Sequence, residues 1–309
     1  MQWKRRRSQV RGVSVCLAAL TILLAVAGCD GATVIAGPPP TEHAAQVIFP
    51  TATATTTPPS RPLPPAPHLS ATAAYLLNAD TGQVYLAVNA NTKLAMASTT
   101  KIMTAVVALT YGKLDQQITV GADAVALENI GNSQAGVQIG DKISLQNLLY
   151  GLLLPSGDDA AVVIADGIAG SQARFVQLMN LEAFLLGLTS THYTNVHGLD
   201  APGHYTTARD LATLAQFAMR YSAFRQVVGT AVYTLPATAT HAAYTWTTTN
   251  ELLTTMPYPG VTGIKTGYTG NAGSCLVFAA TRPAGKLIGV VLGERDQAEQ
   301  ARFTDASAL

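Results

Sequence analysis

Ser98 and Lys101 form a Ser-x-x-Lys pair in the stretch Met96–Thr104. Apolar residues follow at helical spacing, so a helix that starts near Ser98 would place both side chains on one face. A serine hydroxyl needs an adjacent base to become a nucleophile at neutral pH. Lysine can be that base if burial or a second cation lowers its pKa, so the pair predicts a nucleophile and base with another positive charge nearby. The alternative is a helix N-cap serine beside a solvated lysine.

A second chemical element lies in the stretch Leu153–Ala161, where Ser156 and Asp158 flank a glycine. Ser156 also follows a proline, at the predicted junction of two helices. The alternative is an N-cap serine followed by acids in the first helical turn, where negative charge is favoured.

The third element is Lys265-Thr266-Gly267, within the glycine-rich stretch Gly260–Gly270. A lysine and a hydroxyl side by side are suited to binding a carboxylate, and Gly267 permits close approach of a ligand to the backbone. The alternative is an edge-strand lysine that opposes aggregation.

Ser-x-x-Lys, Ser-x-Asn and Lys-Thr-Gly, in this order, mark the penicillin-binding proteins and serine β-lactamases. With the stretches 97–104, 154–161, 195–200, 204–212 and 263–269, the folded part resembles the low-molecular-mass D-alanyl-D-alanine carboxypeptidases of serine peptidase family S11. The resemblance implies an α+β fold in which helices flank an antiparallel sheet and form a helical lobe. It also implies a penicillin-binding hydrolase that removes the terminal D-alanine from peptidoglycan stem peptides, with β-lactams as inhibitors and no cofactor.

The resemblance implies a role for each motif residue. Ser98 is the nucleophile that forms the acyl-enzyme, Lys101 is the general base with its pKa lowered by Lys265, and Ser156 relays a proton. The implied substrate-binding residues are Asp158, Lys265, Thr266, Gly267 and Tyr268, the last through its backbone N–H in an oxyanion hole shared with the N–H of Ser98.

Asp158 departs from the family pattern, which has asparagine at this position. An ionised aspartate only accepts hydrogen bonds, whereas asparagine also donates them. A carboxylate beside Lys101 would raise the pKa of that lysine and weaken it as a base. We expect a compensating interaction, for example with Lys265, that preserves activity.

The elements around these motifs are read from periodicity and turn residues. Two apolar runs on either side of Asp80-Thr81-Gly82 predict a β-hairpin, and four helical patterns fill the middle of the chain: 145–154, 157–168, 173–188 and 207–221. Further strands are predicted at 117–120, 231–235, 245–248, 263–267, 275–281 and 287–292, with a last helix at 296–306. The two β portions are expected to form one antiparallel sheet with the helical middle over one face. A doubly wound parallel sheet is not expected, because regular strand–helix alternation is absent.

The N-terminal segment predicts export. A basic start precedes a sixteen-residue apolar run, Val13–Gly28, which is short for a membrane span and typical of a secretory signal. It ends at Cys29, as in the lipobox of bacterial lipoproteins, so residues 1–28 are predicted to be a lipoprotein signal peptide and Cys29 to carry lipid. An ordinary signal peptide or an uncleaved anchor are the alternatives. Residues 29–69 include ten prolines and predict a disordered tether to the catalytic domain, 70–309.

The charge balance and the spacing of possible metal ligands limit the classes of partner that the protein is expected to bind. Removal of residues 1–28 leaves 14 basic against 18 acidic side chains, a formal charge of −4, which gives no electrostatic case for nucleic-acid binding. His192, His197 and His204 lack the spacing of a zinc motif. Cys275 is left without a partner for an internal disulfide and is expected to be an apolar filler. We expect an extracytoplasmic, lipid-anchored monomer without a metal.

Two other functions remain open at the level of sequence. One is a serine β-lactamase, whose efficient deacylation in one class uses a dedicated glutamate. Glu182 is the only glutamate between Gly131 and Asn250, and no matching motif surrounds it. The other is a non-catalytic lipoprotein that binds peptidoglycan or β-lactams, with Asp158 as the disabling change.

Overall fold

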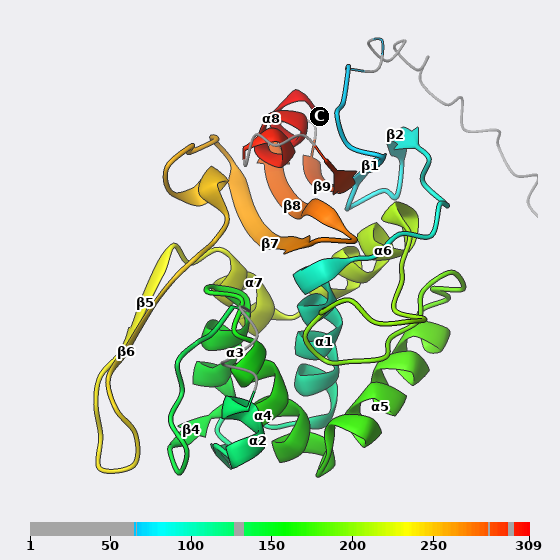
Figure 1. The fold of residues 1–309 in the computed structure, drawn as a ribbon. Helices are drawn as coiled ribbons and strands as arrows, with labels where there is room; N and C mark the ends of the chain where they lie inside the picture. Colours follow the sequence, from blue (N-terminus) through cyan, green and yellow to red (C-terminus); the bar gives the residue numbers. More distant parts are fainter. Residues whose placement is uncertain (1–64, 66, 127–132, 284, 296–299) are drawn as a thin grey trace, which may run out of the picture. The chain divides into compact units, whose positions relative to one another are not determined.

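A five-stranded antiparallel sheet brings together the two ends of the folded chain in the computed structural model (Figure 1). The structure describes residues 65, 67–126, 133–283, 285–295 and 300–309. The strands lie in the order β2-β1-β9-β8-β7, and their bounds are Ala73–Asn78 (β1), Val84–Val88 (β2), Val261–Thr269 (β7), Gly273–Arg282 (β8) and Gly285–Glu294 (β9). The predicted hairpin is β1–β2, and β1 then pairs with β9, with Ala73 opposite Leu292. The predicted union of the two β portions is therefore confirmed for these strands.

Two short strand pairs lie outside this sheet, so the prediction of a single sheet was too broad. They are β3 (Gln117–Thr119) with β4 (Lys142–Ser144), and β5 (Val232–Leu235) with β6 (Tyr244–Thr247). The β5–β6 ribbon stacks its aromatic face on a helix, with the Tyr233 and Tyr150 rings 3.7 Å apart at their centroids. Tyr233 also stacks on Trp246. Aromatic packing on the helical lobe therefore holds the ribbon away from the main sheet.

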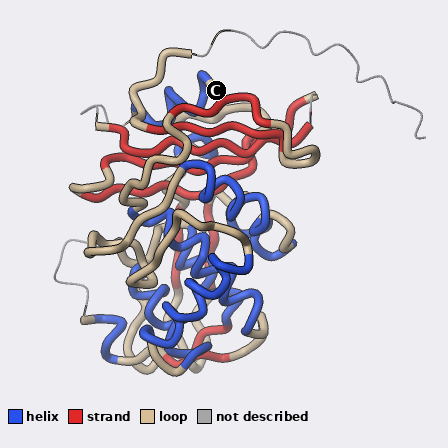
Figure 2. Tube along the Cα trace, turned by 90° about the vertical axis from the view of Figure 1, so that its right-hand side faces the viewer, coloured by secondary structure: helices blue, strands red, loops and turns tan. Residues whose placement is uncertain are grey.

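Seven helices occupy the described middle of the chain and lie beneath one face of the sheet (Figure 2). They are α1 (Lys101–Tyr111), α2 (Ala122–Val125), α3 (Leu145–Leu153), α4 (Asp158–Ala169), α5 (Gln172–Leu185), α6 (Ala208–Ala218) and α7 (Ser222–Val228). The four helical patterns of the sequence correspond to α3, α4, α5 and α6. The one-turn α2, the short α7 and a 3₁₀ turn at Glu251–Leu253 have too few residues for a periodic signal.

Helix α1 is central to the larger core. Ile102, Met103, Val106 and Val107 are completely buried, and so is Lys101 at its first position. A buried lysine is rare unless its charge is paired or its pKa is lowered. The alternative in which Lys101 is a solvated side chain is therefore excluded.

Helix α8 (Ala301–Ala308) covers the opposite face of the sheet, where Phe303 packs in a second core with Phe278 and Val291 (Figure 1). Its Asp305 carboxylate accepts the backbone N–H of Ser70 at 3.2 Å and of Ala71 at 2.8 Å. The start of the folded chain is thus bound to its last helix.

The predicted signal peptide, Cys29 and most of the predicted tether lie outside the described residues, as do 296–299 at the start of the predicted last helix. Within the described ranges, no helix has both the length and the apolar character needed to cross a membrane.

Candidate active site

Ser98 and Lys101 meet at the junction of a 3₁₀ turn (Ala97–Thr100) with α1. Lys101 Nζ donates a hydrogen bond to Ser98 Oγ at 2.9 Å and another to the His197 carbonyl at 2.8 Å. Its third partner is the Asp158 carboxylate, with which it forms an ion pair. Ser98 is half-buried, whereas Lys101 is fully enclosed. The predicted nucleophile and base are therefore in direct contact.

Burial is the main cause that lowers the pKa of Lys101 below its ordinary value of 10.5. The Asp158 carboxylate acts in the opposite direction, through its charge and its hydrogen bond. The expectation that Lys265 holds this pKa down was thus wrong about the main cause. The larger effect is on Lys265 itself, whose pKa lies well below 10.5 because of burial and the charge of Lys101.

Ser156 occupies the break between α3 and α4 in a left-handed backbone conformation, with φ of +68°. The N-cap of α4 is Gly157, so Ser156 is not the N-cap serine of the alternative interpretation. Its side chain is buried, and its Oγ has no hydrogen-bond partner among the described residues. An unpartnered hydroxyl at a cavity wall is available to a ligand.

The two acids that open α4 have different surroundings. Asp158 forms an ion pair with Lys101, the predicted general base, and its charge also acts on Lys265, where it raises the pKa. Asp159 is buried and accepts backbone N–H groups of Ala135, Gly136 and Val137 at 2.8 to 3.1 Å. The first acid is an electrostatic part of the site, and the second holds the neighbouring loop.

Strand β7 forms the opposite wall. Although β7 is an edge strand, Lys265 is only 1% exposed, which excludes the solvated edge lysine of the alternative interpretation. Lys265 Nζ donates to the Thr266 carbonyl at 3.0 Å, and the Thr266 hydroxyl shares a hydrogen bond with that of Thr249. Tyr268, whose backbone N–H is the predicted oxyanion donor, is 68% exposed.

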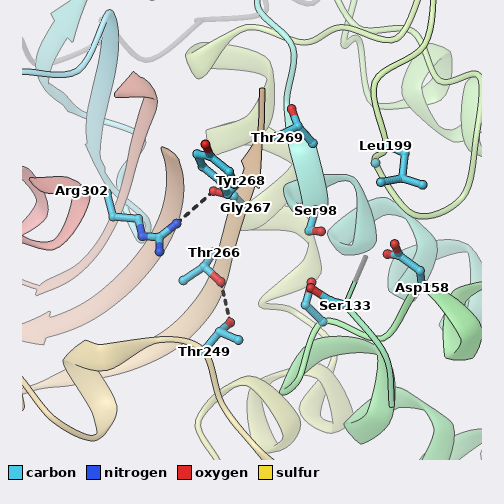
Figure 3. Close-up of a pocket in the computed structure, with 12 residues that line it drawn as sticks. Ser98, Ser133, Asp158, Leu199, Thr249, Thr266, Gly267, Tyr268, Thr269 and Arg302 are labelled. Atoms are coloured by element: carbon cyan, nitrogen blue, oxygen red, sulfur yellow. Dashed lines mark hydrogen bonds between the residues drawn. The ribbon is translucent and has the colours of Figure 1, made fainter. Parts of the chain in front are cut away.

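These elements surround a cavity of about 280 Å³ (Figure 3). Of the predicted site residues, Ser98, Ser156, Asp158, Thr266, Gly267 and Tyr268 line it. Lys101 and Lys265 are buried and contact the lining residues Ser98 and Thr266, but they are not among the residues that line the cavity.

Six further residues line the cavity, and none of them was predicted from the sequence to be a site residue: Ser133, Gly198, Leu199, Thr249, Thr269 and Arg302. Arg302 reaches across from α8 and donates to the Gly267 carbonyl at 3.1 Å (Figure 3). Gly198, Leu199 and Thr269 lie in stretches that carried the family resemblance. The others come from loops and a distant helix, so no local sequence pattern could have indicated them.

The segment 195–200 packs against both walls of the cavity. Its Val196 carbonyl accepts the Thr104 hydroxyl of α1 at 2.6 Å. At its other end, Asp200 accepts the Thr269 hydroxyl at 2.7 Å and the Asn271 N–H at 3.1 Å. The segment thus connects the start of α1 to the end of β7.

Cys275 is buried on β8 opposite Gly267, and burial raises the pKa of its thiol to about 11. A thiol with so high a pKa is a poor nucleophile at neutral pH. The described ranges contain no cluster of three or more His, Cys, Asp or Glu side chains that could hold a metal ion.

A hydroxyl bonded to a buried lysine, beside a second buried lysine on a sheet edge, defines a serine acyl-transfer site. The family described as D-alanyl-D-alanine carboxypeptidase (Peptidase_S11) matches residues 59–296. The chain belongs to this family of serine peptidases, as the resemblance predicted.

Known relatives agree with this assignment. The chain is 39% identical to a D-alanyl-D-alanine carboxypeptidase of Streptomyces sp. strain K15, over 79% of this chain and 87% of the relative. It is 38% identical to the Bacillus subtilis D-alanyl-D-alanine carboxypeptidase DacF, of which it spans 57%.

Solved structures confirm the fold. The crystal structure of the Streptomyces K15 DD-transpeptidase superposes with a TM-score of 0.72 at 40% identity, covering 79% of this chain and 96% of that one. Penicillin-binding protein 6B from Escherichia coli gives a TM-score of 0.72 at 35% identity, covering 80% and 78%. The predicted α+β class is therefore correct.

Proposed function

We propose that this chain is a serine D-alanyl-D-alanine carboxypeptidase that removes the terminal D-alanine from peptidoglycan stem peptides. The observation that carries the proposal is the 2.9 Å hydrogen bond from Lys101 Nζ to Ser98 Oγ beside the cavity. Membership of the family supports a substrate that ends in D-Ala-D-Ala.

Acylation begins when Ser98 Oγ attacks the carbonyl carbon of the penultimate D-alanine. The Ser98 proton passes to neutral Lys101, which the 2.9 Å contact already places in position. The carbonyl oxygen becomes an oxyanion, which the backbone N–H groups of Ser98 and Tyr268 receive. Loss of one such donor costs about 10²- to 10³-fold in rate in other hydrolases.

Collapse of the tetrahedral intermediate breaks the peptide C–N bond. Ser156 Oγ passes a proton from Lys101 to the departing amine of D-alanine, a role that its buried position at the cavity wall supports. Water then attacks the carbonyl carbon of the Ser98 ester and gives up a proton to Lys101. The bond from that carbon to Ser98 Oγ breaks, Lys101 returns the proton to Ser98 Oγ, and the shortened peptide leaves as a carboxylate. A β-lactam acylates Ser98 by the same attack on its strained amide.

The substrate's terminal carboxylate is proposed to bind at the β7 wall. Lys265 supplies positive charge there and the Thr266 hydroxyl supplies a donor, while Gly267 lets the peptide approach the strand. Arg302 adds a second cation on the same side of the cavity. Asp158, whose carboxylate contacts Lys101 Nζ, contributes to the wall next to Ser98.

The β-lactamase alternative loses its candidate base. Glu182 is buried on α5, where its carboxylate accepts the Tyr111 hydroxyl at 2.8 Å, and it is not among the residues that line the cavity. No glutamate lines the cavity in the described part of the chain.

The location is proposed from the N-terminal sequence. Residues 1–28 are a lipoprotein signal peptide, lipid on Cys29 anchors the protein, and residues 29–69 connect the anchor to an extracytoplasmic catalytic domain at 70–309. We further propose that the protein acts as a monomer.

The test is release of D-alanine from diacetyl-Lys-D-Ala-D-Ala by the full-length chain in detergent, with labelling by a fluorescent penicillin in parallel. We expect both activities in the wild type and neither in Ser98→Ala. Labelling without release would indicate the non-catalytic binding protein. Faster turnover of penicillin than of peptide would indicate the β-lactamase.

A further inference from the structure

The peptide between Ala97 and Ser98 is in contact with an inner hydrogen-bond chain that starts at His204. We propose that His204 is a positioning residue for the oxyanion hole, acting through Thr100 on the Ala97–Ser98 peptide. This inference rests on the proposed function, because it concerns the N–H that receives the oxyanion. His204 does not touch the substrate, and its effect would be exerted entirely through the backbone.

This hydrogen-bond chain consists of two hydrogen bonds between buried groups. His204 Nε2 lies 2.8 Å from Thr100 Oγ1, and Thr100 Oγ1 donates to the Ala97 carbonyl at 2.7 Å. Thr100 is completely buried and His204 nearly so. Because water is excluded from these groups, each hydrogen bond must be satisfied within the protein.

The direction of proton donation along these hydrogen bonds follows from Nδ1, the other ring nitrogen of His204. The backbone N–H of Thr194 donates to His204 Nδ1 at 3.1 Å, so Nδ1 carries no proton in the neutral ring. The ring proton is therefore on Nε2, which donates to Thr100 Oγ1. The Thr100 hydroxyl in turn uses its own proton for the Ala97 carbonyl. The donor and the acceptor of each of the two hydrogen bonds are thus defined.

The ring stays neutral over the range in which the enzyme would work. Burial lowers the pKa of His204 to about 4, with smaller contributions from His197 and His192. The direction of donation is therefore the same at pH 6 and at pH 8.

The carbonyl of Ala97 and the N–H of Ser98 belong to one planar peptide unit. A hydrogen bond that fixes the carbonyl therefore also fixes the direction of the N–H. This restraint matters because Ala97 has a φ of +48°, a conformation that is unfavourable for a residue with a side chain. Without the bond, the peptide would have more freedom to rotate away from the cavity.

Two glycines allow the neighbouring backbone to approach that peptide closely. A Cβ at Gly198, whose φ is +104°, would lie 2.0 Å from the Ala97 carbonyl oxygen. A Cβ at Gly267 would lie 3.1 Å from the Ser98 nitrogen. The peptide is thus enclosed by backbone on two sides, and the hydrogen bond from Thr100 sets its rotation.

Thr99 supplies a matched control. It lies in the same 3₁₀ turn, is equally buried, and donates its hydroxyl to the carbonyl three residues earlier, that of Met96. Its bond, however, is to a different peptide unit, which does not carry the Ser98 N–H. Thr99→Val and Thr100→Val therefore remove similar hydroxyls with different expected effects on the oxyanion.

The experiment compares full-length wild type with His204→Ala, His204→Gln, Thr100→Val and Thr99→Val. Two quantities are measured with penicillin: the second-order acylation rate constant, and the ester carbonyl stretch of the acyl-enzyme by infrared difference spectroscopy. A polarised ester carbonyl in an intact oxyanion hole absorbs at lower wavenumber. The melting temperature of each variant reports any general loss of stability.

We expect His204→Ala and Thr100→Val to acylate about tenfold to a hundredfold more slowly, with the carbonyl stretch moved to higher wavenumber. Gln keeps an N–H donor near the position of Nε2, so His204→Gln should stay within about threefold of the wild type. Thr99→Val should lose a comparable amount of thermal stability while its carbonyl stretch stays in place.

An unchanged carbonyl stretch in His204→Ala and Thr100→Val would overturn the inference, even if acylation slowed, because it would assign both residues a structural role. An equal shift in Thr99→Val would also overturn it. Failure of the wild type to acylate would contradict the proposed function, and the inference with it.

Discussion

Asp158 sets the electrostatics of the nucleophile, because it forms an ion pair with the same ammonium group that contacts Ser98. Lys101 must be neutral to accept the Ser98 proton, so acylation should rise as pH increases through the pKa of Lys101. Burial lowers that pKa and the Asp158 charge raises it. The carboxylate therefore moves the rise of activity toward higher pH.

We predict that Asp158→Asn shifts the rising limb of the acylation pH profile to lower pH. Turnover at the optimum should change by no more than about tenfold, because the lysine and serine stay in contact. Acylation by fluorescent penicillin between pH 5 and 10 measures the shift. Asp166→Asn removes an acid about two turns further along α4 and should leave the profile unchanged. A profile of Asp158→Asn that does not move, or moves upward, would contradict this account.

Lys265 is predicted to recognise the substrate's terminal carboxylate. Lys265→Met keeps most of the side-chain volume and removes the charge, so kcat/KM on the D-Ala-D-Ala peptide should fall about 10- to 100-fold, the usual cost of a charged hydrogen bond. A peptide ending in D-Ala-D-alaninamide, which lacks the terminal carboxylate, tests whether this carboxylate is the group that Lys265 binds. The wild type should discriminate strongly against the amide, and Lys265→Met should not. Equal losses on both peptides would show that Lys265 acts elsewhere.

Much of the residue-scale site could be predicted from sequence, because each motif is local. Ser98 and Lys101 share a turn of chain, and Lys265 to Tyr268 share a strand. The contact of Asp158 with Lys101, which the family pattern anticipated, is made only by the packing of α4 against α1, and no local motif encodes it. Arg302 was missed for a related reason, because only the packing of α8 brings it to the cavity.

At the scale of elements, the start of α4 determines the shape of one cavity wall. Asp159 accepts three successive N–H groups of the loop at 135–137, and the Asp158 N–H donates to the Ser133 carbonyl at 2.9 Å. Since Ser133 lines the cavity, the same contacts that hold the loop also form the wall.

We predict that Asp159→Ala lowers the free energy of unfolding by about 2–4 kcal/mol, because it leaves several buried N–H groups without an acceptor. Urea unfolding followed by tryptophan fluorescence measures the change. Asp115→Ala removes an exposed acid and should stay within about 0.5 kcal/mol of the wild type. A loss of similar size in both variants would show that the loop does not depend on Asp159.

Element prediction succeeded where periodicity was long and failed where it was short. Four helical patterns of the sequence correspond to α3, α4, α5 and α6, and the hairpin turn at Asp80–Gly82 is present. The β5–β6 ribbon was placed in the wrong sheet because alternation along a strand specifies a buried face but not the element against it. For this ribbon the partner is Tyr150 on α3.

At the scale of the whole molecule, the folded part is closed by contacts between its ends, with Ser70 and Ala71 bound to Asp305. The proposed tether reaches this point from Cys29 through about forty residues. In polyproline form, at about 3.1 Å per residue, such a segment would extend on the order of 100 Å. Activity should therefore be independent of the anchor, whereas location should depend on it.

We predict that Cys29→Ser moves the protein from the membrane fraction to the soluble extracytoplasmic fraction when it is expressed in a bacterial host. Metabolic labelling with a fatty acid should be lost in the same variant, while penicillin labelling of Ser98 is kept. Cys16→Ser, a change within the proposed signal peptide, is the control and should leave both properties unchanged. Continued fatty-acid labelling of Cys29→Ser would refute lipidation at this residue.

The most direct test of the whole account is to locate the penicilloyl group by mass spectrometry. The full-length chain and Ser98→Ala are incubated with penicillin, digested and mapped. The account predicts one adduct of the intact penicillin mass, on the peptide that contains Ser98, and none in Ser98→Ala. An adduct at another residue, or an unmodified Ser98 in a folded wild-type chain, would contradict it.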